Sequence, residues 1–158
     1  IDASSLLWRL QLRGVDVANR WTGVAERWAA MANDGRYAFN DFHAAMAFAC
    51  SGRTDLLDGL SEAQRRACQQ DDDNARFTAM IGAPGVEAVT AFVDGQYARC
   101  VDLLRPVRSQ AHVFGGSHAQ RDLIDQTLLT AARRSDQHSL ARGLQREREL
   151  LARRRSAA

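Results

Sequence analysis

Apolar residues recur every three or four positions along most of this chain, and no run alternates with a convincing period of two. Between residues 17 and 32, for example, Trp21, Val24, Ala25 and Trp28 form one apolar stripe. Residues at this spacing lie on the same face of an α-helix. The sequence therefore predicts an all-α protein with essentially no sheet.

Short turns interrupt the helical pattern near residues 14, 52, 95 and 135, at spacings of 38, 43 and 40 residues. Around the third turn, Phe92 precedes Gly95, and Tyr97 and Leu104 follow it. A glycine that ends one helix, flanked by aromatic and small residues that fill the crossing, is typical of tetratricopeptide helix hairpins. We expect a tetratricopeptide-like α-solenoid of about four antiparallel helix hairpins, forming one helical-repeat domain over residues 1–158.

Local signals also predict where individual helices begin and end. Asn40 or Asp41 is expected to cap a helix that runs to Ser51, and Ser117 is expected to cap a helix over residues 118–134. The string Gly82-Ala83-Pro84-Gly85 is the strongest loop signal in the chain.

Longer strings within the repeats are more specific than the turn spacing. They are residues 37–48, residues 95–101 and residues 115–122, together with the opening Ala3-Ser4-Ser5-Leu6-Leu7-Trp8-Arg9-Leu10. Together they resemble the tetratricopeptide repeat protein 38 family over nearly the whole chain. The resemblance implies a helical-repeat fold in the C-terminal part of such a protein, and it implies no established activity. The absence of an initiator methionine before Ile1 also favours a fragment.

Charge gives little reason to expect a nucleic-acid partner. The chain carries 21 basic residues, all of them arginine, against 19 acidic residues, for a net charge of +2. Eight arginines fall within residues 133–155, where aromatic side chains that could stack on bases are absent. We expect a solvated terminal helix there, with an RNA-binding or acid-binding tail as the alternative.

Cysteine usage and hydropathy favour the cytoplasm. Cys50, Cys68 and Cys100 are widely spaced, so they form neither a disulfide framework nor a zinc motif, and we expect buried reduced thiols. The longest apolar run, residues 44–50, is far too short to cross a membrane.

The first candidate site follows two glycines at the predicted start of a helix. Ser117, His118, Arg121 and Asp122 lie there, and the last three share a helical face. Free amides at a helix start favour an anion, and a histidine and aspartate four residues apart suit a metal or an acid–base pair. The alternative is structural, with Ser117 capping the helix and Arg121 paired with an aspartate.

Asn40, Asp41 and His43 make the second candidate site. His43 shares an apolar stripe with Phe39 and Met46, which favours a core histidine bonded to backbone or to a carboxylate. A site for a metal or for acid–base chemistry would require His43 and His118 to converge in space.

The fold class favours a scaffold that binds a protein or peptide partner in a concave groove, with Asn40, Asp41, Arg121 and Asp122 as contacts. We expect no catalytic residue, metal or cofactor, because no nucleophile elbow, zinc motif or phosphate loop is present. One alternative is an enzyme, or a protein that binds a small molecule or metal between the two candidate segments. A homo-oligomer through an unpaired solenoid end is a third reading.

Overall fold

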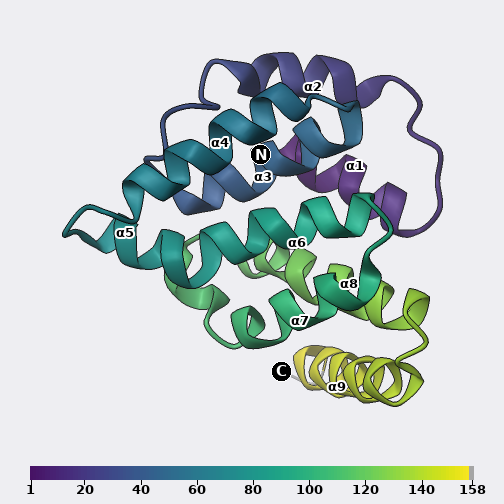
Figure 1. Cartoon of the computed structure of the whole chain (residues 1–158). Helices are drawn as coiled ribbons and strands as arrows, with labels where there is room; N and C mark the ends of the chain where they lie inside the picture. Colours follow the sequence, from purple (N-terminus) through teal and green to yellow (C-terminus); the bar gives the residue numbers. More distant parts are fainter. Residues whose placement is uncertain (157–158) are drawn as a thin grey trace.

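The computed structural model describes residues 1–156, leaving aside the side chains of Phe114, Arg155 and Ser156. Every regular element in this part of the chain is a helix (Figure 1). In order, they are α1 (Asp2–Leu12), α2 (Arg20–Ala29), α3 (Ala38–Ser51), α4 (Thr54–Ala67), α5 (Asp73–Phe77), the π-helix η1 (Thr78–Gly82), α6 (Ala83–Val93), α7 (Tyr97–Arg108), the 3₁₀-helix η2 (Ala111–Phe114), α8 (His118–Arg134) and α9 (His138–Ser156).

Within residues 1–156 the helices form four antiparallel hairpins, which are α1–α2, α3–α4, α6–α7 and α8–α9, with α5 and η1 between the second and the third. At the third turn Gly95 has a φ of 75°, a conformation that only glycine adopts without strain. The predicted all-α architecture of stacked helix hairpins is confirmed.

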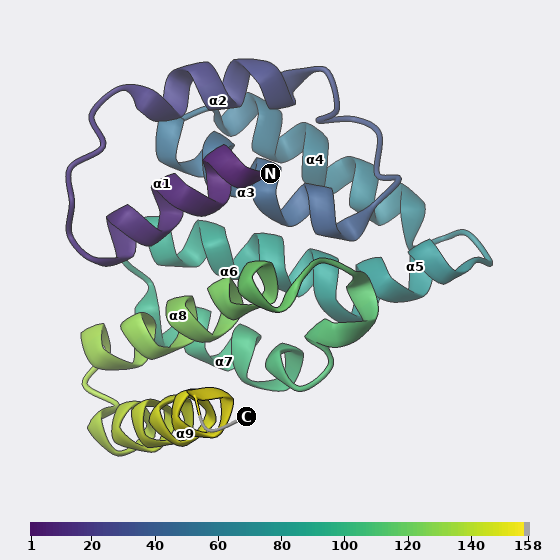
Figure 2. The ribbon, with the colours of Figure 1, turned by 180° about the vertical axis from the view of Figure 1, so that it is seen from behind.

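The first helix of each hairpin faces the centre of the molecule. Helix α1 packs against α3 and α8, α3 packs against α6, and α6 in turn packs against α8. The second helices α2, α4, α7 and α9 lie outside this group, as the two opposite views show (Figure 1, Figure 2). Contact between α1 and α8 joins the first hairpin to the last.

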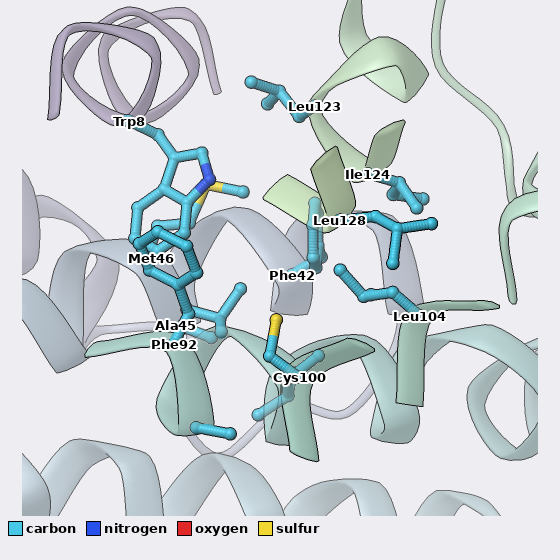
Figure 3. Packing of buried hydrophobic residues seen from close by; sticks show 14 of the residues in the cluster. Trp8, Phe42, Ala45, Met46, Phe92, Cys100, Leu104, Leu123, Ile124 and Leu128 are labelled. Carbon is cyan, nitrogen blue, oxygen red and sulfur yellow. The ribbon is translucent and has the colours of Figure 1, made fainter. Parts of the chain in front are cut away.

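Trp8 is central to that closing contact. Its side chain is fully buried, and its indole Nε1 donates to Thr127 Oγ1 on α8 at 2.8 Å. Its ring centroid lies 5.4 Å from that of Phe92 on α6. Figure 3 shows Trp8 beside Phe92 and Met46, with Leu123 on α8 facing the same core. The face that would be concave and open in an extended solenoid is therefore filled by this protein's own core.

The Gly82–Gly85 string is helical, so the predicted loop is wrong. Pro84 lies at the start of α6, directly after the π-helix η1, where the Ala83 N–H donates to the Thr78 carbonyl. A Cβ added to Gly82 would lie 2.7 Å from the Ala38 Cβ, and one added to Gly85 would lie 3.0 Å from the Phe42 ring. These glycines allow η1 and α6 to approach α3 closely.

Two further expectations need correction. Helix α3 begins at Ala38, so Asn40 and Asp41 lie inside its first turn and do not cap it. Cys68 is exposed and Cys50 is half-buried, so only Cys100 is the fully buried thiol expected of all three. Within residues 1–156, no helix combines the length and the apolar character that a membrane span requires.

Candidate functional site

The start of α8 is locked in place by its own side chains and by α3. Ser117 Oγ accepts from the Gln120 N–H, and Gln120 Oε1 accepts from the Ser117 N–H, so the predicted cap is confirmed and is a full capping box. Gly115 and Gly116 precede it with positive φ, and a Cβ on Gly116 would overlap the Phe39 ring. The cap uses amides that an anion would need, which weakens the predicted anion site at this helix start.

Ser117→Ala is expected to lower the free energy of unfolding by about 1 kcal/mol, because it leaves the Gln120 N–H without its cap. Urea denaturation followed by circular dichroism measures this loss. Ser61→Ala, at an exposed position inside α4, is the matched control and should change stability by less than about 0.5 kcal/mol. Equal effects in the two variants would contradict the capping role.

A cavity of about 680 Å³ opens beside this helix start, between the end of α7, η2, α8 and α9. Three of the predicted site residues line it, namely His118, Arg121 and Asp122. Leu151, which is 44% exposed, gives it apolar surface. We call this cavity the η2–α9 groove.

Two arginines of the η2–α9 groove are neutralised by carboxylates. Arg108 Nε lies 2.8 Å from Asp125 Oδ1, and Arg108 Nη1 lies 3.0 Å from Glu147 Oε2. Arg148 pairs with Asp122, whose carboxylate Gln126 also contacts. The hydrogen bond to Glu147, and to a smaller extent the hydrogen bond to Asp125, raises the pKa of Arg108. This network ties α9 to α7 and α8 and leaves these groups little capacity for another ion.

Asp122 is held in its ionised form by this network. Burial of its carboxyl group opposes ionisation, but hydrogen bonds from Arg148 and Gln126 outweigh that effect, so the pKa of Asp122 lies below its usual value. Asp122 is thus a structural anion rather than a proton donor or acceptor near neutral pH.

Arg121 has a different environment from the other two arginines. It donates to the carbonyl groups of Gly116 and Gly115, and its Nη2 lies 3.3 Å from His118 Nδ1. It does not make the predicted ion pair with an aspartate in the described part of the chain. Among the described residues, Arg121 is therefore a cationic side chain of the groove, beside the exposed His118, with which no carboxylate pairs.

The second candidate segment is buried, and its histidine is sealed. His43 is fully buried; its Nδ1–H is assigned as donating to the Phe39 carbonyl at 2.8 Å, and its Nε2 accepts from Ser5 Oγ at 3.1 Å. Burial lowers the pKa of His43 to about 4, so the ring is neutral at pH 7. The interpretation as a core histidine bonded to backbone is confirmed.

Asp41 is also buried, and it accepts from Gln64 Nε2 of α4 at 3.1 Å. Burial raises the pKa of Asp41 to about 6, although the Gln64 hydrogen bond acts in the opposite direction. Neighbouring Asn40 has a buried Oδ1 with no hydrogen-bond partner among the described residues. The Asp41 carboxylate therefore faces α4 and is not available to a ligand in a concave groove.

The two segments touch without forming one site. Gly116 packs on the Phe39 ring, and the Phe39 and His43 ring centroids are 4.5 Å apart. However, the η2–α9 groove is lined by His118 and not by Asn40, Asp41 or His43. Within the described residues, no three His, Cys, Asp or Glu side chains are grouped so as to hold a metal ion.

Sequence reasoning missed Arg108 and Arg148 as groove residues. Arg148 lies four residues after the core residue Leu144, a spacing that places it on the packed side of α9. Arg108 gave no local signal, because its partner Glu147 is 39 residues away.

Comparisons with family models and with solved structures do not assign the chain to a family. No family model matches the chain. No solved structure is significantly similar to it. The resemblance to the tetratricopeptide repeat protein 38 family stays a prediction that is based on the strings quoted above.

Proposed function

We propose that this protein is a helical-repeat scaffold that binds a protein or peptide partner along its terminal hairpin, α8–α9. The observation that carries the proposal is the η2–α9 groove, which combines the exposed Leu151 with Arg121, a cation that pairs with no carboxylate of the described residues. An apolar surface beside a few directed polar groups is the usual composition of a binding groove. We place the scaffold in the cytoplasm, which its three free cysteines support.

The position of the groove follows from the packing of the hairpins. Tetratricopeptide-like scaffolds present a concave face formed by first helices, but here those helices form the core. The outer hairpin is therefore the better-supported surface for a partner. The Arg108 and Arg148 ion pairs fix α9 relative to α7 and α8, so the groove is preorganised. Binding of a ligand then costs less conformational entropy of the protein.

An enzyme built from both candidate segments has less support. Its acid–base pair would need His43 and His118 in one cleft, and His43 is fully enclosed by Phe39 and Ser5. A homo-oligomer through exposed Leu150 and Leu151 on α9 would use the same hairpin and is an outcome of the test below.

The proposal is tested by panning a displayed library of random 12-residue peptides against the folded protein and measuring an enriched peptide by calorimetry. Leu151→Ser is expected to weaken binding by about tenfold, because it removes an apolar contact from the groove. Leu6→Ser, at an exposed leucine of α1, is the matched control and should leave binding unchanged.

Enriched peptides that bind the Leu151→Ser variant as tightly as the original protein would contradict the groove assignment. Failure to enrich any peptide, together with a dimer in sedimentation analysis, would contradict the scaffold and favour self-association of α9.

A further inference from the structure

A second groove lies further along the same hairpin, between the end of α8 and the first half of α9. Its volume is about 600 Å³, and it shares no lining residue with the η2–α9 groove. The lining residues are Arg133, His138, Ala141, Arg142, Gln145, Arg146 and Glu149. We call it the Arg133–Arg146 groove.

The arginines of this groove are not neutralised. Arg133 donates to Gln145 Oε1 at 3.1 Å and Arg142 donates to Ser139 Oγ at 3.2 Å, both of them uncharged acceptors. Within the described residues, neither these two nor Arg146 takes part in an ion pair, although ion pairs are common elsewhere on the surface. Three arginines and Glu149 give this small surface a net charge of +2 from these four side chains.

The packing of α9 explains why the charge is unbalanced. Glu147 is next to Arg146 in sequence, but its carboxylate turns to Arg108 of α7. Arg148 turns in the same way to Asp122 of α8. Glu147 is thus used to attach the helix, and Glu149, which accepts from Gln145 Nε2, is the carboxylate that remains in the groove lining.

The three arginines of this groove repel one another, and Glu149 offsets only one of their three charges. Arg142 and Arg146 lie four residues apart on one helix, a spacing at which like charges cost about 0.2–0.5 kcal/mol. Arg133 of α8 lines the same groove and adds a third like charge. Guanidinium groups bind carboxylates through paired hydrogen bonds, and several of them in a row suit a ligand with several carboxylates.

We propose that the Arg133–Arg146 groove binds an acidic segment of a peptide or protein partner. The inference rests on the proposed scaffold function and names the chemistry of the partner that α8–α9 would recognise. Carboxylates of the segment bind Arg133, Arg142 and Arg146, while Ala141 contacts its backbone or aliphatic stems. A nucleic acid fits less well, because the lining has no Phe, Tyr or Trp side chain on which bases stack.

The test is fluorescence anisotropy with a labelled 12-residue peptide of alternating glutamate and alanine, and a second peptide with glutamine in place of glutamate. The triple variant Arg133→Gln, Arg142→Gln, Arg146→Gln is expected to bind the acidic peptide about tenfold more weakly than the original protein. The matched control changes Arg13, Arg27 and Arg105 to glutamine; these exposed arginines lie elsewhere and have the same total charge. The control should weaken binding less than about twofold, and salt should weaken the original complex.

Three results would overturn the inference. The two triple variants could lose affinity for the acidic peptide equally, or the original protein could bind the glutamine peptide as tightly as the acidic one. The third result is tighter binding of single-stranded RNA than of the acidic peptide. If library peptides bind at Leu151 while the acidic peptide does not bind, the scaffold function stands and the acidic partner is wrong. If the acidic peptide depends on the three groove arginines while the library peptides bind the Leu151→Ser variant as tightly as the original protein, the inference is supported and the η2–α9 groove is rejected.

Discussion

Trp8→Ala is expected to lower the free energy of unfolding by about 4 kcal/mol, a large part of the stability of a domain of this size. The indole is fully buried between α6 and α8, so truncation removes a large apolar surface and leaves a cavity. It also removes the hydrogen bond to Thr127. Urea denaturation followed by circular dichroism measures the change.

Leu6→Ala is the control for the Trp8 variant, because Leu6 is on the same helix and 58% exposed. It should change stability by less than about 0.5 kcal/mol. A loss below about 1 kcal/mol for Trp8→Ala would mean that α1 is only loosely attached, and the first and last hairpins would then not form a common core.

Asp41→Asn is expected to raise the free energy of unfolding at pH 7, by up to about 3 kcal/mol. Burial raises the pKa of Asp41 from its usual value of 3.8 to about 6, so the folded protein binds the carboxyl proton more tightly than the unfolded chain. The free energy of unfolding therefore falls as pH rises from about 4 to about 6. The total fall is about 1.4 kcal/mol for each unit by which the pKa of the folded protein exceeds that of the unfolded chain. Asparagine is not ionised, and its carbonyl still accepts from Gln64.

The gain from Asp41→Asn should shrink to less than about 1 kcal/mol near pH 4, where the carboxyl group is protonated in the folded protein and partly protonated in the unfolded chain. His43 supplies an opposite dependence, because burial lowers its pKa from 6.5 to about 4. The contribution of neutral His43 to the free energy of unfolding is complete above pH 6.5 and is lost as pH falls toward 4. The two effects oppose each other in the original protein, and the Asp41 variant exposes the histidine effect as a steep loss of stability on acidification.

Unfolding free energies at a series of pH values from 4 to 7 provide the measurement for Asp41→Asn. Asp102→Asn, at an exposed aspartate of α7, is the control and should change stability by less than about 0.5 kcal/mol throughout. A destabilised Asp41 variant at pH 7 would show that the ionised carboxylate is well solvated in the folded protein.

Features encoded locally could be predicted from the sequence. Ser117 and the helix that follows it are an example, because a capping residue and a glycine pair act on neighbouring amides. The hairpin turn at Gly95 is another, since it depends on a positive φ at a single residue. Such signals predict the helix order and the four hairpins without knowledge of which helices pack together.

Features that depend on tertiary packing could not be predicted in this way. Gly82 and Gly85 carry a strong loop signal, yet they form helix because α3 approaches them closely through Ala38 and Phe42. Aspartate is a typical helix cap by residue type, but Asp41 lies inside α3, where it accepts a hydrogen bond from the buried Gln64 amide. Closure of the hairpins, which buries the concave face, depends on contacts between α1 and α8 that are more than 100 residues apart in sequence.

Closure of α1 onto α8 decides where a partner can bind, because it removes the concave groove and leaves the outer hairpin as the available surface. A double-mutant cycle of Trp8→Phe and Thr127→Val, which are 119 residues apart, tests it directly. If α1 closes onto α8, the cycle should give a coupling of about 1 kcal/mol in the unfolding free energy, as expected for a buried hydrogen bond. Additive effects, with coupling below about 0.3 kcal/mol, would contradict closure and restore an open solenoid with an accessible concave face.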